Sequence, residues 1–158
     1  MRLPKWAAIP VAALLAAVLI SGCGQSVYSD DTRIASTVEE YTYTTCNGGP
    51  DADGVQQQFT GFTGVDRLWT VSAAQDTTVK LEFSRQGKKG RWKFVAIQPD
   101  GQVFTLLEQK DDSTFSGDMS FDLKKGETNL CLVGDKADGT VILHFTEKAG
   151  LSFTASYG

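Results

Sequence analysis

The residue with the most clearly indicated chemistry is Cys23, whose thiol directly follows a short apolar stretch near the N-terminus. Arg2 and Lys5 supply positive charge, residues 6–20 form an apolar segment of 15 residues, and the small residues Ser21-Gly22 come next. This order is typical of an export signal. The segment is shorter than the roughly 20 apolar residues that a membrane-spanning helix needs. Because an export signal requires no cysteine at this point, the position of Cys23 indicates a further reaction at its thiol.

The segment Ile20-Ser21-Gly22-Cys23 resembles the lipobox of bacterial lipoproteins, in which an aliphatic residue and two small residues precede a lipidated cysteine. The resemblance implies that Cys23 carries a diacylglycerol thioether, that cleavage removes a signal peptide of residues 1–22, and that a further acyl chain such as palmitate joins the freed amine. Two chains anchor a protein stably, whereas one binds only marginally. We therefore expect export and anchoring at the outer face of the bacterial cytoplasmic membrane. A plain secreted protein and an uncleaved N-terminal anchor are the alternatives.

The chain beyond the expected cleavage site has the size of one domain and an acidic balance. It comprises 136 of the 158 residues, a usual length for a single domain. Residues 1–22 hold two of the 15 basic side chains and none of the 19 acidic ones, so the remainder has 13 basic and 19 acidic side chains and a formal charge of −6. Binding to nucleic acid relies on clustered Lys and Arg, so we expect no nucleic-acid partner.

Two further cysteines, Cys46 and Cys131, remain once Cys23 is assigned to the lipid. An even number of cysteines in an exported chain predicts a disulfide between them. The bond would join positions 85 residues apart, and loop closure on that scale contributes about 4 kcal/mol in the chain-entropy model. Two buried free thiols that pack as small apolar side chains are the alternative.

Alternation of apolar and polar residues begins after a polar segment. Residues 23–36 have no apolar period, and we interpret them as a flexible tether. In 79–83, 115–123 and 141–145, apolar and polar side chains alternate, which is the pattern of half-buried strands. Further strands are expected at 38–46, 56–62, 68–73, 91–98, 102–108 and 128–133.

Turn residues separate these segments and define the expected fold. Pro99-Asp100-Gly101 predicts a hairpin turn, because Pro fixes φ and Gly tolerates a positive φ. Residues 124–127 and 135–139 are expected as the next two connections. Eight or nine short strands, with no convincing helix after the leader, predict an all-β domain over residues 37–158, an antiparallel β-sandwich or jelly roll.

A basic stretch around an aromatic residue is the candidate binding patch. It consists of Lys88, Lys89, Arg91, Trp92 and Lys93. Such a patch could contact lipid headgroups, an anionic wall polymer or a sugar ring stacked on Trp92. By alternation, however, Trp92 lies on the same face as two apolar residues, so a place in the core is favoured.

Catalytic chemistry is only weakly indicated. His144 is the single histidine, and a triad would need a nucleophile and a carboxylate to converge on it. Glu82 and Glu108 both lie on expected strands and are the only pair that we name for glycoside hydrolysis. We assign no catalytic residue and no cofactor.

Metal binding is indicated no more strongly. Asp51-Ala52-Asp53-Gly54 is similar to the start of a calcium loop but lacks its later ligands, and Asp135 with Asp138 forms a weaker version. Asp and Gly are also the ordinary residues of turns, and we assign no metal site.

Residues 59–145 also resemble small, uncharacterised lipoproteins of Gram-positive bacteria. The resemblance is carried by Phe59-Thr60-Gly61, Trp69, Val79 to Phe83, Gly90 to Ile97 with Pro99-Asp100-Gly101, and Leu132 to Gly139. It implies a fold but no active site. We therefore expect a lipid-anchored, non-catalytic binding or accessory module for a carbohydrate, a wall polymer or a protein. The alternative is a small envelope hydrolase or metal-dependent enzyme.

Overall fold

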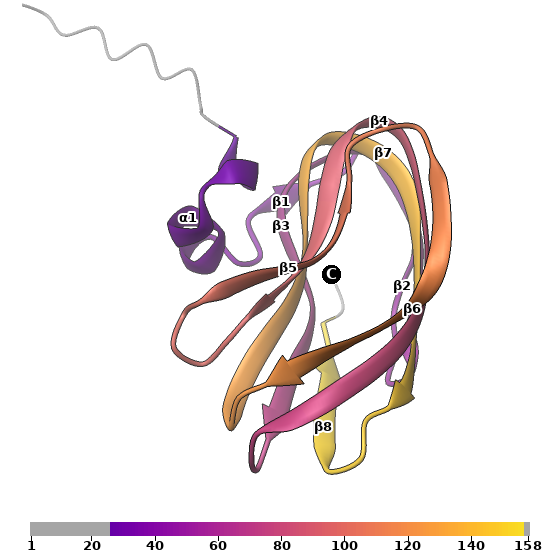
Figure 1. The fold of residues 1–158 in the computed structure, drawn as a ribbon. Coiled ribbons are helices and arrows are strands. Elements are labelled where there is room, and N and C mark those ends of the chain that lie inside the picture. Colours follow the sequence, from indigo (N-terminus) through magenta and orange to yellow (C-terminus); the bar gives the residue numbers. More distant parts are fainter. Residues whose placement is uncertain (1–25, 157–158) are drawn as a thin grey trace, which may run out of the picture.

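The computed structural model describes residues 26–156, so that Cys23 and the expected signal peptide lie outside the described part. A 3₁₀ helix and a short α-helix precede eight strands (Figure 1). In chain order these elements are η1 (Val27–Ser29), α1 (Asp31–Ser36), β1 (Tyr41–Thr42), β2 (Thr45–Pro50), β3 (Gly54–Ala73), β4 (Thr77–Ile97), β5 (Val103–Gln109), β6 (Thr114–Leu123), β7 (Gly126–Glu147) and β8 (Leu151–Ala155). No helix among residues 26–156 is long and apolar enough to cross a membrane.

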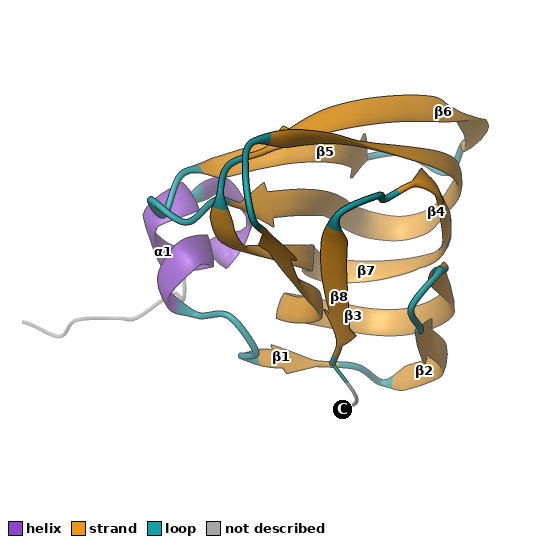
Figure 2. Cartoon of the chain, turned by 90° about the horizontal axis from the view of Figure 1, so that it is seen from below, coloured by secondary structure: helices purple, strands orange, loops and turns teal. Residues whose placement is uncertain are grey.

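All strand pairs are antiparallel, and three long strands form the centre of the sheet. β7 lies between β3 and β4, with β1 beside β3 and β5 beside β4. β2 and β8 also pair with β3, and β6 also pairs with β4. Because β3, β4 and β7 bend sharply, the sheet folds over on itself and its two halves face each other (Figures 1 and 2). The predicted all-β antiparallel β-sandwich is confirmed.

The long strands correct the predicted connections. Residues 135–139 form no turn between strands; they lie inside β7, which runs from Gly126 to Glu147. The two strands expected at 79–83 and 91–98 are likewise one strand, β4. The turn-forming residues bend the strands here without ending them. The neighbouring strands bend beside them, so the β3–β7 and β4–β7 hydrogen-bond ladders continue on both sides of the register shifts. The turns at Pro99-Asp100-Gly101 and Lys124-Lys125 are confirmed as connections.

Glycines make the bend sterically possible. Gly64 of β3 pairs with Gly134 of β7. Gly64 has a φ of +109°, in the region that favours glycine, and a Cβ there would lie 2.1 Å from the carbonyl oxygen of Glu40. A Cβ on Gly134 would lie 2.3 Å from Cδ1 of Phe62. The bend therefore excludes side chains at positions where the two halves of the sheet approach each other.

The main core lies between the two halves. Trp69 packs edge-to-face on Phe94 and on Phe145, with ring centroids 6.4 and 5.0 Å apart. Trp92 packs in the same way on Phe59, at 5.9 Å. Both tryptophans are fully buried. The alternating residues of the sequence thus form one core, and aromatic side chains connect its two layers.

A second, smaller core lies on an outer face of the sheet, beneath the N-terminal helices (Figure 2). Val27, Tyr28 and Ile34 pack there against sheet residues that include Val65 and Cys131. This corrects the expected tether, because residues 27–36 are helical and docked. The polar sequence concealed the docking, since only three buried apolar side chains, together with the partly buried Ala35, make the contact in a stretch of capping residues. We call residues 26–36 the N-terminal cap.

We expect Gly134→Ala to lower the free energy of unfolding by about 1–3 kcal/mol, because the new methyl would overlap the ring of Phe62, which is buried and packed against Tyr43 and Phe59. Gly49→Ala is the matched control: no heavy atom lies within 4 Å of its Cβ position, so the change should stay within about 0.5 kcal/mol. Chemical denaturation of the two variants measures both values. Equal stability would contradict the account of the bend.

Candidate functional site

An open hollow of about 340 Å³ lies on the concave side of the sheet, next to β1 and β2. Its lining comes from both halves of β3, from β1 and β2, and from the C-terminal end of the chain. The lining residues are Tyr41, Tyr43, Cys46, Gly48, Gly49, Pro50, Gln57, Asp66, Leu68 and Ser156. The volume is within the usual range for small-molecule sites.

A polar network forms part of the lining. The Tyr43 hydroxyl donates a hydrogen bond to Oδ2 of Asp66 at 2.5 Å and accepts one from Nε2 of Gln57 at 2.9 Å. The same nitrogen lies 3.2 Å from Sγ of Cys46. Gln57 and Asp66 are nine positions apart on β3 and meet at Tyr43 only because β3 bends between them. The bend therefore assembles the network.

Burial raises the pKa values of the three titratable side chains of this network, Asp66, Tyr43 and Cys46. Burial raises the pKa of Asp66, and the hydrogen bonds from Tyr43 and Gln57 partly oppose that shift. Burial and the neighbouring Asp66 raise the pKa of Tyr43 well above its usual range. Burial also raises the pKa of Cys46. The phenol and the thiol therefore stay protonated at neutral pH, and the thiol is not activated as a nucleophile.

Aromatic rings form another part of the wall. Tyr43 stacks on Phe62 of the core, with centroids 4.6 Å apart and an interplanar angle of 16°. Tyr41 meets Tyr43 edge-to-face at 5.4 Å. Both tyrosines are partly exposed. The hollow thus offers ring surface next to an amide and a carboxylate, a combination that can bind a small ligand with both apolar and hydroxyl surface.

Sequence reasoning did not identify this site. Gln57 and Asp66 lie at inward-facing positions of β3, and Gln57 is 2% exposed. A polar residue in an inward register is a signal that could have found them, but Gln57 was part of one predicted strand and Asp66 lay between two. Tyr41 and Tyr43 lay in a predicted strand, with nothing to show that they border an opening.

The predicted disulfide is wrong for this structure, because Cys46 and Cys131 are both free. Cys46 lines the hollow on the concave side of the sheet. Cys131 is fully buried in the second core, beneath the N-terminal cap. The sheet separates the two environments. The alternative of free thiols holds for Cys131, which packs as a small apolar residue, whereas Cys46 is exposed.

The basic candidate patch does not form one surface. Trp92 is fully buried, as its alternation with apolar residues predicts, and Lys93 is 7% exposed. Arg91 and Lys93 lie over the ring of Tyr28, at 4.4 and 5.0 Å from its centroid, and so hold the N-terminal cap. Only Lys88 and Lys89 of this stretch are exposed. Trp92 is therefore not available to stack a sugar.

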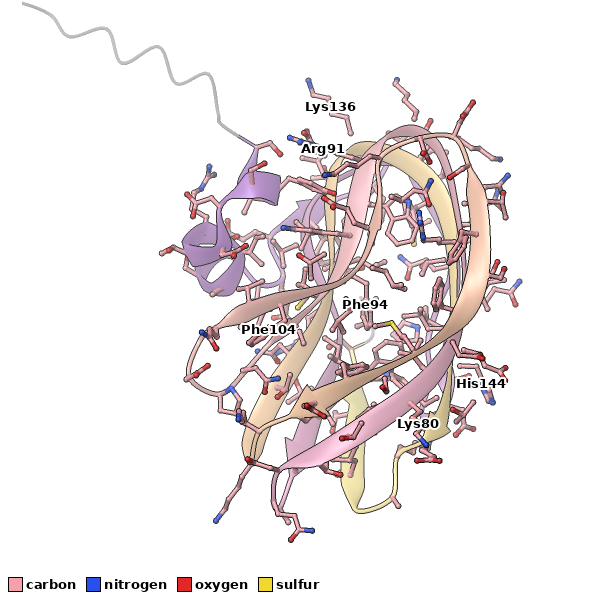
Figure 3. The ribbon with its side chains drawn as sticks, viewed as in Figure 1. Lys80, Arg91, Phe94, Phe104, Lys136 and His144 are labelled. Carbon is pink, nitrogen blue, oxygen red and sulfur yellow. The ribbon has the colours of Figure 1, made fainter. Side chains whose placement is uncertain are left out.

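The candidate catalytic residues do not converge. His144 is exposed on β7 (Figure 3), opposite Glu82 of β4, and no hydrogen bond or ion pair joins its side chain to another residue of 26–156. Glu108 is on β5, opposite Lys93 of β4. Lys93 is eleven positions farther along β4 than Glu82, and Glu108 accepts a hydrogen bond from Tyr28. The two glutamates thus belong to different surfaces.

The candidate calcium ligands have other partners. Oδ1 of Asp51 accepts the backbone N–H groups of Asp53 and Gly54, as in an ordinary Asx turn, and Asp53 pairs with Lys148. Asp135 pairs with Arg91, and Asp138 accepts the N–H of Gly61. Within residues 26–156, no three His, Cys, Asp or Glu side chains gather as a metal site.

Comparison with known proteins gives structural similarity only. No protein-family model and no curated protein sequence matches the chain. A family 35 carbohydrate-binding module from an environmental isolate is 20% identical, with a TM-score of 0.39 over 76% of this chain and 85% of that one. The module CBM6cm-2 of Cellvibrio mixtus lichenase 5A, solved with cellotriose, is 11% identical, with a TM-score of 0.38 over 72% and 94%. CBM35 of Cellvibrio japonicus Abf62 is 14% identical, with a TM-score of 0.35 over 76% and 83%. Because these values are low, no ligand or binding residue is transferred to this chain.

We expect Asp66→Asn to change how stability depends on pH. The folded pKa of Asp66 is raised, so the folded state binds its proton more tightly than the unfolded state does, and stability from this group falls as pH rises from the unfolded pKa through the folded one. The variant lacks this loss. Relative to Asp66→Asn, the wild type should therefore become less stable between about pH 4 and neutral pH. Urea unfolding across that range measures the difference, and a constant difference would contradict the raised pKa.

Proposed function

We propose that this protein is a lipid-anchored, non-catalytic binding module of the bacterial cell envelope, and that its hollow binds a carbohydrate. The observation that carries the proposal is the network of Tyr43, Gln57 and Asp66 beside partly exposed tyrosine rings. Carboxylate and amide oxygens accept hydrogen bonds from sugar hydroxyls, and the amide N–H donates to them. The negative face of an aromatic ring attracts the weakly positive C–H face of a sugar.

The same lining favours binding over catalysis. Among the described residues of the hollow, Asp66 is the single carboxylate, and none is a histidine. Glycoside hydrolysis normally uses two carboxyl groups on either side of the scissile bond. Hydrogen bonds among Tyr43, Gln57 and Asp66 hold these side chains in place, which lowers the entropy cost of binding. A wall polymer built from sugars has the same chemistry, and a protein partner is the competing class.

We expect Asp66→Asn to weaken carbohydrate binding about tenfold or more, because a hydrogen bond to a charged group is worth about 1.5–3 kcal/mol. Glycan and wall-polysaccharide panels identify a ligand, and titration calorimetry measures the change in Kd. Asp118→Asn is the control, since this carboxylate is exposed on β6 and does not line the hollow. Equal affinity of wild type and Asp66→Asn for an identified glycan would rule out the hollow as its site.

The anchor is the second part of the proposal, and its support is the segment Ile20-Ser21-Gly22-Cys23. In protein extracted from bacterial membranes, we expect the mature chain to begin at Cys23 and to carry a diacylglyceryl group and an acyl chain. Intact-mass and N-terminal peptide mass spectrometry measure this. Cys23→Ala should leave the chain unprocessed by this route and without lipid. An unmodified Cys23 in wild-type protein would refute the anchor and leave the binding site unaffected.

A further inference from the structure

The docked N-terminal cap brings the folded domain close to Cys23. Ser26, the first described residue, caps η1 by accepting the N–H of Tyr28 on its hydroxyl. Three residue steps separate Cys23 from Ser26, and an extended chain spans at most about 3.6 Å per residue. The cap therefore begins within about 11 Å of Cys23 in any conformation of the intervening residues. An anchored Cys23 would leave no room for a long tether.

Buried contacts hold the N-terminal cap against the sheet, so the short distance to Cys23 applies to the whole domain. Tyr28 is 3% exposed and lies under the side chains of Arg91 and Lys93. Its hydroxyl donates to Oε1 of Glu108 at 2.9 Å, and Ile34 is fully buried in the second core. The surface around Ser26 is thus fixed relative to the sheet.

That surface adjoins the bend of β4 and β7. Ser26 and Arg91 line the same shallow depression, and Arg91 follows Lys88-Lys89 on β4. Lys136 of β7 lies beside this stretch, because a Cβ on Gly90 would contact its backbone carbonyl. Figure 3 shows Arg91 and Lys136 at the end of the molecule where the described chain begins.

The lysines of this bend differ from most others in having no ionic partner. Of the lysines in residues 26–156, five form ion pairs: Lys80, Lys93, Lys110, Lys124 and Lys148. The exposed side chains of Lys88, Lys89, Lys125 and Lys136 form none. Three of these four lie on the bend.

The acidic side chains nearest the bend are mostly engaged. Asp135 is paired with Arg91 at 3.0 Å, Asp138 accepts the N–H of Gly61, and Asp31 of the cap lies 3.9 Å from Nζ of Lys93. Asp111 and Asp112 lie in the loop beside Gly87, so the bend carries charges of both signs. Its ammonium groups without an ion pair are those of Lys88, Lys89 and Lys136, on a chain that is acidic overall. Anionic headgroups attract such groups, each to a modest extent.

We propose that the bend formed by Lys88, Lys89 and Lys136 lies against anionic lipid headgroups, so that the domain sits on the membrane in one orientation. The proposal rests on the proposed acylation of Cys23, which brings this end of the domain to the bilayer. Attraction between these three unpaired ammonium groups and the anionic headgroups then selects the face that meets the bilayer. The other faces of the domain remain accessible to the medium.

Amine footprinting of the full-length protein, purified from bacterial membranes, tests the orientation. The protein is compared in detergent, in phosphatidylcholine vesicles and in vesicles that also contain phosphatidylglycerol, with an acetylating reagent and peptide mass spectrometry. In the anionic vesicles, we expect Lys88, Lys89 and Lys136 to react about fivefold more slowly than in detergent. Lys124 and Lys125 should react equally in both. The protection should weaken in 1 M salt, where screening is strong.

The chain contains its own matched control, because Lys-Lys-Gly occurs twice, at 88–90 and at 124–126. Lys88→Gln with Lys89→Gln should reduce the protection of Lys136, whereas Lys124→Gln with Lys125→Gln, an identical change in charge, should not. Acylated Cys23 with evenly reactive lysines would overturn the orientation alone. An unmodified Cys23 would overturn the anchor and the orientation together, and the carbohydrate titration remains a separate test of the hollow.

Discussion

The three long strands β3, β4 and β7 bend side by side in one region of the sheet. In that region Gly64 of β3 pairs with Gly134 of β7, and Gly87 of β4 pairs with Gly139 of β7. Backbone hydrogen bonding requires this agreement, because a strand that bends alone would break its ladder on both sides. The bend brings the apolar faces of the two half-sheets together and so creates the main core. Because of the bend, each of the three long strands runs through both layers, where the sequence analysis expected separate short strands.

The candidate site is a consequence of the same bend. Gln57 and Asp66 belong to the two halves of β3, and the hydroxyl of Tyr43 joins them. A carboxylate at this depth is unfavourable for stability, as its raised pKa indicates. Retaining it in a lining that also contains partly exposed rings is the pattern expected where binding rather than stability determines the residue. The fold and the proposed function are therefore coupled at one strand.

The sequence predicted the features that depend on local pattern. Alternation identified the inward faces, placed Trp92 in the core and gave the fold class. It did not predict that residues 135–139 continue a strand, because Asp and Gly have the same local preferences in a bend as in a hairpin turn, and only the neighbouring strands decide between them. The hollow was missed for the same reason, since its residues meet across the bend. The disulfide failed because an even cysteine count contains no information on distance or face.

The N-terminal cap shows how a few buried contacts can outweigh composition. Residues 26–36 are polar, yet Tyr28 alone provides ring contacts to Arg91 and Lys93 and a hydrogen bond to Glu108. Those contacts turn two residues of the basic stretch toward the cap, and Lys88 and Lys89 remain exposed beside Lys136. The stretch that sequence alone treats as one patch thus divides in two: its second half fixes the cap to the sheet, and its first half stays exposed to solvent. Because the cap starts three residues after Cys23, both halves bear on the proposed orientation: the second half fixes the cap relative to the sheet, and the first half presents the lysines that the proposal places at the headgroups.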